Sequence, residues 1–216
     1  RGLAGLGDVD SAAPSFSLWE LSRAIRDDEE LSGLFDDGID GLLDRLETLD
    51  SSNAQQFRDA FQKFLYDYGS RGPNEWELSA QTWETDPSIP LRTLDQVRKQ
   101  PDEKNPQNGA DNASEDRQQV VEEVRNKLAE LGNDELIDVF EGALVGANQM
   151  VFRERAKTSL VRVLHESRMA IRELGKRHAD SGTVNDPEHI FMLLDEELES
   201  FVADPSRYSA LLHDRY

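Results

Sequence analysis

Basic residues gather in one part of an otherwise acidic chain. The 216 residues contain 24 Lys and Arg against 44 Asp and Glu, which gives a formal net charge of −20 at pH 7. Between residues 149 and 178, however, eight Lys and Arg stand against three Glu. At about 100° per residue around a helix, Arg153, Lys157, Arg168 and Arg172 form one basic stripe. Such a stripe can hold a phosphate or an acidic partner; the alternative is that it forms ion pairs with carboxylates of neighbouring helices.

Few other residue patterns in the chain could do chemistry. The absence of Cys excludes a disulfide framework and thiolate sites for zinc or iron–sulfur clusters. Neither common glycine-rich phosphate loop is found, and no GxSxG elbow. The four His lack the Glu three residues earlier that a dimetal site in a bundle would need. The acidic cluster at residues 27–30 lacks the spacing of an EF-hand, so we interpret it as a solvated helix end and predict no metal site.

Composition narrows the class of protein further. An acidic chain argues against a nucleic-acid binder, because phosphate neutralisation requires a basic surface. No apolar run approaches the roughly 20 residues that a bilayer crossing requires, and the start of the chain lacks the regions of a signal peptide. We therefore expect a soluble, cytoplasmic protein. Because the sequence begins with Arg1 rather than Met, we expect a fragment or processed piece of something longer.

The stretches between Pro and Gly residues show helical periodicity. The SLWE motif that starts at Ser17 is a capping box and predicts a helix start. Ser51 or Ser52 predicts another, and Gly69 predicts a left-handed cap at the end of that helix.

A very long helical segment is predicted in the second half of the chain. From Asp134 to about Ala179 there is no proline, and apolar residues keep helical spacing. This pattern predicts one very long helix, or two nearly continuous helices, bent near Gly142 and Gly146.

Two stretches interrupt the helical pattern. Residues 69–92 contain three prolines, which prevent a continuous helix. We predict a long structured loop there with Trp76 and Trp83 in the core, followed by a short helix around residues 93–99. Residues 101–116 contain no apolar residue larger than Ala and predict a flexible polar linker.

Together these elements predict an all-α fold. We expect an antiparallel helical bundle that contains the long, bent helix and the structured loop. We assign residues 1–100 to an N-terminal helical part, residues 101–116 to the linker and residues 117–216 to a C-terminal helical part. The two parts are expected to form a single substrate-binding domain.

Three segments, taken in order, resemble motifs of one enzyme family. Residues 68–79 read YGSRGPNEWELS and residues 83–87 read WETDP, similar to a G-H-R-G-P-x-E … W-x-E-D-P segment. Residues 153–157 read RERAK, similar to an R-E-x-x-K helix. GTVNDPEHIF at residues 182–191 and DEEL at residues 195–198 are similar to G-x-I-x-D-P-E-D-V-F … L-D-E-L. The motifs are those of phosphoenolpyruvate-utilising proteins of the rifampin phosphotransferase and phosphoenolpyruvate-synthase-like group.

The resemblance implies a three-part enzyme with an ATP-grasp domain, a helical substrate-binding domain and a swivelling domain that carries a phosphorylated His. This sequence resembles only the helical middle part, since neither the ATP-grasp signature nor the Gly-rich Ser-His motif is found in it. We expect ATP and Mg²⁺ as cofactors of the full-length enzyme and none in this chain, which alone is predicted to be inactive. Its partners would be a small-molecule acceptor and the two other domains, in the same polypeptide or another.

The resemblance also implies roles for individual residues. Arg153 and Lys157 would be catalytic and would stabilise charge on the transferring phosphoryl group. The acceptor would lie in an apolar cleft between helices, with the two cations at its mouth. The candidate substrate-binding residues line this cleft, continue the basic stripe or lie in the loop: Met150, Phe152, Gly142, Gly146, Arg168, Arg71 and Glu75.

Some residues depart from the family pattern or have a different expected role. Arg71 and Glu75 would form a structural or docking pair within the loop. Ser70 stands where the group usually has His, and Ala156 stands where the best-known rifampin enzymes have Pro. These departures leave the acceptor, and with it any part in antibiotic resistance, unassigned.

An alternative function from another class is a non-catalytic helical interaction module, in which the basic stripe docks an acidic partner. Such docking should weaken steeply with salt, whereas binding of an acceptor in an apolar cleft should be comparatively insensitive to salt. A free-standing hydrolase is disfavoured, because the motifs supply no nucleophile–base pair and no metal-binding set.

Overall fold

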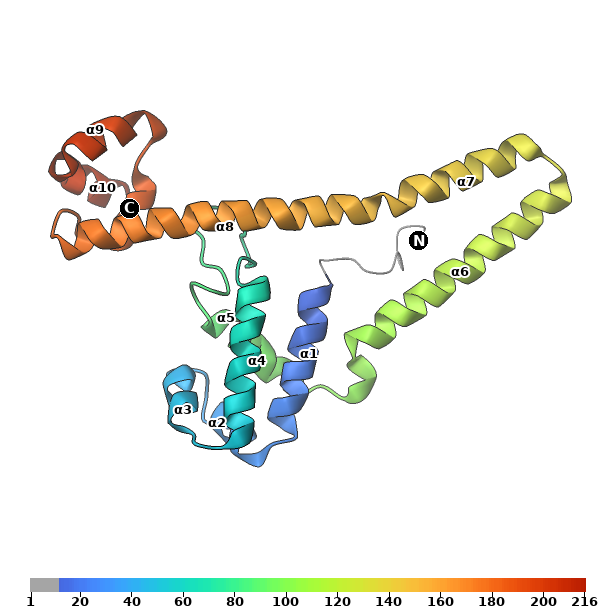
Figure 1. The fold of residues 1–216 in the computed structure, drawn as a ribbon, viewed down its shortest axis with the longest axis horizontal. Coiled ribbons are helices and arrows are strands. Elements are labelled where there is room, and N and C mark those ends of the chain that lie inside the picture. The colour runs from blue at the N-terminus through green and yellow to red at the C-terminus, as the bar shows by residue number, and fades with distance from the viewer. Residues whose placement is uncertain (1–11) are drawn as a thin grey trace. The chain divides into compact units, whose positions relative to one another are not determined.

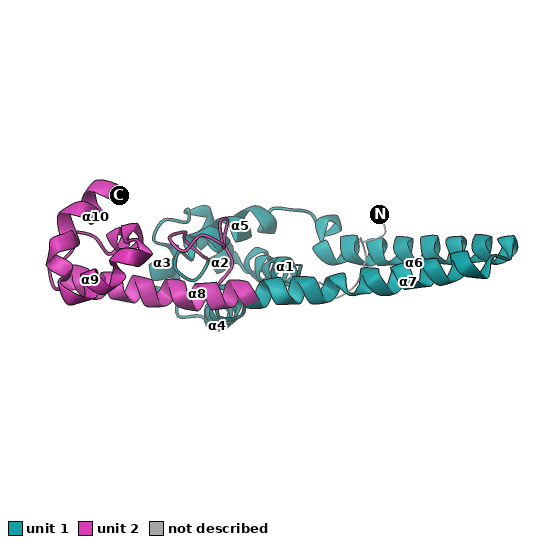
Figure 2. Ribbon diagram, turned by 90° about the horizontal axis from the view of Figure 1, so that it is seen from above, with its two compact units in different colours: residues 1–69, 83–159 teal, residues 70–82, 160–216 magenta. Residues whose placement is uncertain are grey.

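The chain is all-α, as predicted. A computed structural model describes residues 12–216, and every regular element within that range is a helix (Figure 1). None of the helices in this range is both long enough and apolar enough to cross a membrane. The chain divides into two compact units (Figure 2): unit 1 is Arg1–Gly69 with Trp83–Ser159, and unit 2 is Ser70–Thr82 with Leu160–Tyr216.

Unit 1 consists of short helices followed by a long helical hairpin. Its elements are α1 (Ala13–Arg26), α2 (Glu29–Asp36), α3 (Leu42–Thr48), α4 (Ser52–Tyr68), α5 (Ser88–Arg98), a 3-10 turn (Asp102–Lys104), α6 (Pro106–Leu131), α7 (Asp134–Asn148) and the first turns of α8 (Met150–Asp180). Helix α1 packs against both α4 and α5. Helices α6 and α7 run antiparallel (Figure 1), and Gly132, with a φ of 60°, ends α6 in the left-handed conformation.

The core of unit 1 is built around a row of aromatic rings on α4. The ring centroids of Phe57 and Phe61 are 6.0 Å apart, those of Phe61 and Phe64 are 6.2 Å apart, and Phe64 stacks on Trp83 at 5.4 Å. Spacings of three and four residues place these rings on one side of the helix. Trp83 therefore lies against the core, as predicted.

The starts of α2 and α4 are capped by side chains. Ser51 caps α4, as predicted, and Asp28 caps α2 by accepting a hydrogen bond from the Leu31 amide at 2.9 Å. This bond, together with one from the Asn53 side chain, lowers the pKa of the Asp28 carboxyl from its ordinary value. The interpretation of the acidic cluster at residues 27–30 as a helix end is thus confirmed.

The predicted helix start at Ser17 is wrong. Helix α1 begins four residues earlier, at Ala13, and Pro14 lies in its first turn. Proline is favourable there because the first turn has no use for its missing amide hydrogen. The capping-box pattern at Ser17 therefore lies inside the helix.

Gly69 is required for a different reason from the one predicted. Its φ is −59°, which is right-handed, so it is not a left-handed cap. A Cβ at this position would instead clash with the Leu65 carbonyl oxygen and lie 2.8 Å from Glu84 Cβ. Gly69 thus allows the close approach at which its own carbonyl accepts a 3.0 Å hydrogen bond from the Glu84 amide.

The prediction of a flexible linker at residues 101–116 is also wrong. Residues 106–116 form the start of α6, with Pro106 in its first turn and the Asn105 side chain accepting from the Gln107 amide at 3.0 Å. No residue of α6 is buried. Its polar composition therefore reflects a solvated helix, and the division between the two units does not fall at this segment.

The long helical segment is confirmed as two nearly continuous helices. Helices α7 and α8 are interrupted only at Gln149, whose φ of −67° and ψ of −15° remain right-handed. The irregular stretch before α5 is shorter than predicted, because α5 begins at Ser88 and accommodates Pro90 in its first turn. Trp76, predicted to be in the core, is 47% exposed.

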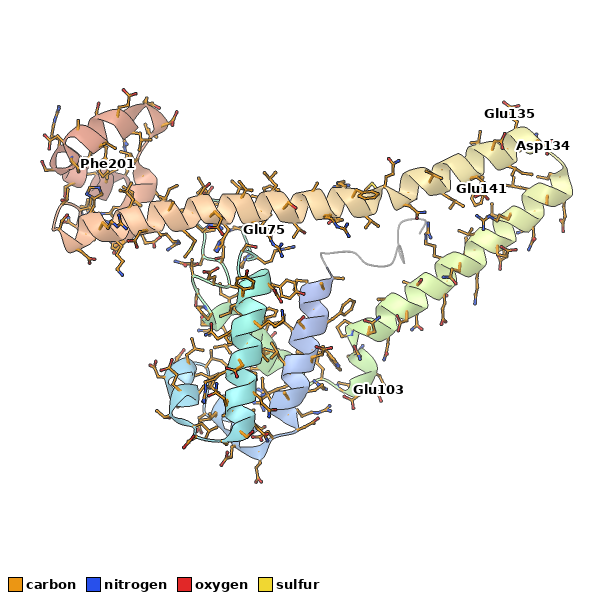
Figure 3. The ribbon with its side chains drawn as sticks, in the orientation of Figure 1. Glu75, Glu103, Asp134, Glu135, Glu141 and Phe201 are labelled. Atoms are coloured by element: carbon orange, nitrogen blue, oxygen red, sulfur yellow. The ribbon has the colours of Figure 1, made fainter. Side chains whose placement is uncertain are left out.

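Unit 2 joins the loop of residues 70–82 to the chain from Leu160 onward. After α8 it contains three 3-10 turns (Pro187–Met192, Asp195–Glu197 and Pro205–Tyr208) and the short helices α9 (Leu198–Ala203) and α10 (Ser209–Arg215). Its small core includes Val184, Ile190, Leu212 and Phe201, the last labelled in Figure 3. Asp186 caps the turn that begins with Pro187.

The close approach at Gly69 predicts a strong effect of Gly69→Ala. We expect the free energy of unfolding to fall by about 2–3 kcal/mol, because the new Cβ must displace backbone atoms. Gly33→Ala is the matched control, since a Cβ at Gly33 in α2 meets nothing within 4 Å and should add about 0.5–1 kcal/mol of stability. Urea denaturation followed by circular dichroism measures both; equal stabilities would contradict the assignment.

Candidate functional site

The two predicted catalytic cations lie at the start of α8, in unit 1. Arg153 and Lys157 are one helical turn apart, the first exposed and the second half-buried. Beside them the ring of Phe152 is 67% exposed. A charged pair and an apolar ring are therefore presented on neighbouring positions of one helix.

The two glycines of α7 share this side of the helix. Because the Gln149 junction keeps right-handed torsions, 100° per residue places Gly142, Gly146 and Arg153 within about 40° of one another. A Cβ built on either glycine meets nothing within 4 Å. We name this surface the α7–α8 face; it consists of Gly142, Gly146, Met150, Arg153 and Lys157, whereas Phe152 lies about 100° around the helix from Arg153. The structure thus brings these predicted residues together on an open face instead of in a cleft between helices.

Arg168, predicted to bind substrate, is fully buried in unit 2. Its Nη2 donates to the carbonyl oxygens of Glu75 and Glu77 at 2.9 and 2.8 Å, and its Nε donates to that of Leu78 at 3.1 Å. Its Nη1 lies 3.2 Å from Nδ1 of His165. Every nitrogen of the guanidinium is engaged, so Arg168 fastens the loop to α8 instead of facing a ligand.

Burial of this cation has an electrostatic cost. Desolvation lowers the pKa of the Arg168 guanidinium, and the charge of Arg172 acts in the same direction, whereas Glu75 and Glu77 oppose it. The neighbouring Arg172 forms an ion pair with Glu188, donates to the Ser79 carbonyl at 3.2 Å and lies 5.3 Å from the ring centroid of Phe191. For Arg172, the alternative that the basic stripe pairs with nearby carboxylates is therefore correct.

The Arg71–Glu75 pair lies inside the loop that Arg168 holds. Arg71 Nε is 2.6 Å from Glu75 Oε2, and the two side chains are only 16% and 10% exposed. Glu75, labelled in Figure 3, therefore makes two kinds of contact: its carboxylate pairs with Arg71, and its backbone carbonyl accepts a hydrogen bond from Arg168. These contacts match the structural role expected for the pair.

Sequence reasoning missed two buried histidines. His165 contacts Arg168, and His189 is 4% exposed, with its ring centroid 5.3 Å from that of His213 and 4.9 Å from that of Tyr216. For His165 the sequence does contain a signal, which is a spacing of three and four residues that marks one side of a helix. The residues at this spacing are Val161, His165, Arg168, Arg172 and Gly175. Four of these five positions are buried.

A groove of about 530 Å³ lies between α6 and α7 in unit 1. It is lined by Ala113, Asp116, Arg117, Gln119, Val120, Val121, Glu123, Val124, Phe140 and Leu144. The predicted cleft residues Gly142, Gly146, Met150 and Phe152 are not among them. The groove and the α7–α8 face are therefore separate surfaces.

Similarity to known proteins extends over most of the chain. Residues 1–154 match the family described as "Rifampicin phosphotransferase fourth domain". The chain is also similar to uncharacterized proteins of Mycobacterium tuberculosis and Mycobacterium bovis, each 25% identical over 214 residues. These alignments cover 95% of this chain but 22% of each relative, so the chain spans about a fifth of the length of these curated relatives.

The contacts of Arg168 predict that its guanidinium is needed to hold residues 70–82. Arg168→Lys keeps the charge but lacks the planar fork, and losing charge-assisted bonds to buried carbonyls should weaken attachment of the loop by about 2–4 kcal/mol. We expect hydrogen exchange of the loop amides to accelerate at least tenfold. Arg177→Met, at an exposed position on the same helix, is the control and should leave exchange unchanged. Unchanged protection in Arg168→Lys would refute the role.

Proposed function

Because the chain belongs to the family of the rifampicin phosphotransferase fourth domain, we propose that it is the acceptor-binding helical domain of a phosphotransferase that uses ATP or phosphoenolpyruvate. The family match confirms the resemblance found in the sequence motifs. The curated relatives are about five times longer than the chain, which leaves room for an ATP-grasp domain and a swivelling domain with a phosphorylated His. ATP and Mg²⁺ would bind outside this chain, in the cytoplasm.

The observation that carries the proposal is the composition of the α7–α8 face. Arg153 and Lys157 supply two positive charges one turn apart, about 40° from each other around the helix. Gly142 and Gly146 leave the neighbouring turn of α7 without side chains, with open space above it. An acceptor with an apolar body could rest on the glycines and Met150 while its reacting hydroxyl lies near the cations.

In this proposal the acceptor hydroxyl attacks the phosphorus atom of phosphohistidine on the swivelling domain. The phosphorus–nitrogen bond breaks as the phosphorus–oxygen bond forms, and negative charge on the phosphoryl oxygens must be stabilised throughout. Arg153 and Lys157 are placed to supply that stabilisation, since guanidinium and ammonium groups are effective at transferring phosphoryl groups. The histidine takes up the hydroxyl proton as it leaves.

The alternative of a docking module for an acidic partner now has less support. It relied on four cations along one stripe, but Arg168 is buried and Arg172 is committed to Glu188 and the Ser79 carbonyl. Only Arg153 and Lys157 of that stripe remain in the α7–α8 face. Two cations suit a single phosphoryl group better than an extended acidic surface.

The proposal predicts separate effects on chemistry and on binding. In the full-length enzyme, Arg153→Ala or Lys157→Ala should lower kcat by about 10²–10³-fold, because each removes charge stabilisation of the transition state. The dissociation constant of the acceptor should change less than about threefold. Steady-state kinetics and equilibrium binding measure the two quantities.

Lys176→Ala is a matched control, because Lys176 is an exposed cation farther along α8; it should leave both quantities unchanged. Wild-type turnover in Arg153→Ala and Lys157→Ala would rule out the proposed role. So would a loss of turnover accounted for entirely by weaker acceptor binding.

A further inference from the structure

The hairpin of α6 and α7 is held at its polar edge and open along its apolar interior. Arg125 forms a two-point ion pair with Glu141, at 2.7 and 2.9 Å, and Figure 3 shows Glu141 extending from α7 toward α6. Arg117 Nη2 donates to Asn148 Oδ1 at 3.3 Å. No residue of either helix is buried. Polar contacts therefore hold the two helices together, while the space between their apolar side chains stays open.

Apolar side chains from both helices face this open interior. Val120, Val121 and Val124 of α6 lie opposite Phe140 and Leu144 of α7 around the groove of about 530 Å³. Apolar side chains that line an open groove stay in contact with water, so a ligand that covers them would remove that apolar surface from water, which is favourable. A volume in the range of about 300–1,000 Å³ with mainly apolar walls is typical of sites for small molecules.

The charge of the hairpin restricts what can fill the groove. Helix α7 has four carboxylates and no Lys or Arg, and α6 has six carboxylates and three cations. Two of the carboxylates, on Asp116 and Glu123, line the groove itself. Anionic ligands would be repelled, and so would the equally acidic hairpin of a second copy. A cationic ligand would in turn place a second positive charge beside Arg117, which also lines the groove, so a neutral ligand avoids all three repulsions.

One lining side chain has an unused hydrogen-bond donor. Arg117 Nε is buried and has no hydrogen-bond partner, although the Nη2 of the same guanidinium is bonded to Asn148. A buried donor without an acceptor costs about 1–3 kcal/mol. A modest rotation of the side chain into the groove would let a ligand oxygen accept that bond.

We propose that the α6–α7 groove is a binding site for a neutral, mainly apolar ring compound that presents a carbonyl oxygen to Arg117. The valines, Phe140 and Leu144 would cover the ring system, and Arg117 would fix its orientation. This site is independent of the proposed phosphotransfer function, because Phe140 and Leu144 lie about 160° around α7 from Gly142. The α7–α8 face could thus be occupied at the same time.

Two ring compounds that differ in a single carbonyl group test the proposal. In the full-length protein, 9-fluorenone should bind about tenfold more tightly than fluorene, because only the ketone can accept from Arg117. Arg117→Met should abolish that preference. Lys127→Met, which removes an exposed cation of α6 outside the groove, should preserve it. Equilibrium dialysis gives each dissociation constant.

A second pair of variants tests the location of binding. Leu144→Trp fills the groove and should weaken binding of both compounds at least tenfold. Val139→Trp adds the same bulk at a position on α7 that is 65% exposed and outside the groove, and should have no effect. Circular dichroism confirms that each variant is folded.

Three outcomes would overturn the proposal. Equal affinity of the wild type for the two compounds would remove the role of Arg117. Binding that Leu144→Trp leaves intact would place the compounds elsewhere. Failure of 9-fluorenone to bind the full-length protein would mean that another segment already covers the groove.

Discussion

The second unit depends on a single buried guanidinium. Arg168 reaches three carbonyl oxygens of residues 75–78 and one ring nitrogen of His165, and so fixes a loop that has no regular hydrogen-bonding pattern of its own. The partners are neutral dipoles, with the carboxylate of Glu75 turned to Arg71 instead. Such an arrangement is sustainable only because each of the three guanidinium nitrogens has a partner, since an unpaired buried charge would cost several kcal/mol.

The same loop shows how one constraint determines others. Because the carbonyls of residues 75–78 point toward α8, the side chain of Trp76 is left 47% exposed. Arg172 extends the attachment to the Ser79 carbonyl and links it to Glu188. The basic stripe predicted from sequence is therefore divided by function: two of its members organise a loop, and two remain on the α7–α8 face.

Much of the helical framework could be predicted from periodicity and capping residues, whereas contacts between distant segments could not. Some features depend only on residues a few positions apart, which the sequence shows directly. They are the row of Phe residues on α4, the caps at Ser51 and Asp186, and the long α7–α8 segment. Local rules predict a left-handed φ at Gly69, whereas the structure requires glycine there because a Cβ would clash with the Leu65 carbonyl oxygen and with Glu84, fifteen residues away. Asn105 and Pro106 are a cap and a first-turn proline, which together indicate a helix start. The polar composition after them suggests a flexible linker instead, but composition indicates whether a segment is buried and not which backbone conformation it adopts.

The candidate site was predictable in its residue types and not in its surroundings. Arg153 and Lys157 stand out by charge, and helical geometry aligns them with Gly142 and Gly146. The partners of Arg168 lie 90 to 93 residues earlier in the chain. The pattern around Arg168 does not reveal them, so from sequence this cation cannot be told apart from the exposed ones. The groove between α6 and α7 was missed for a related reason: a valine pattern looks the same whether or not the opposite helix fills the space.

The sequence separation of the Arg168 contacts has a consequence for the order of synthesis. Its carbonyl partners precede it by 90 to 93 residues. At ribosomal rates of about 5–20 residues per second, the loop of residues 70–82 waits roughly 5–18 s for the helix that will hold it. During that interval the nascent loop lacks its hydrogen bonds to Arg168, whereas helices α1 to α5 of the first unit have already been synthesised. A segment that is translated later thus completes a loop that begins about a third of the way along this chain.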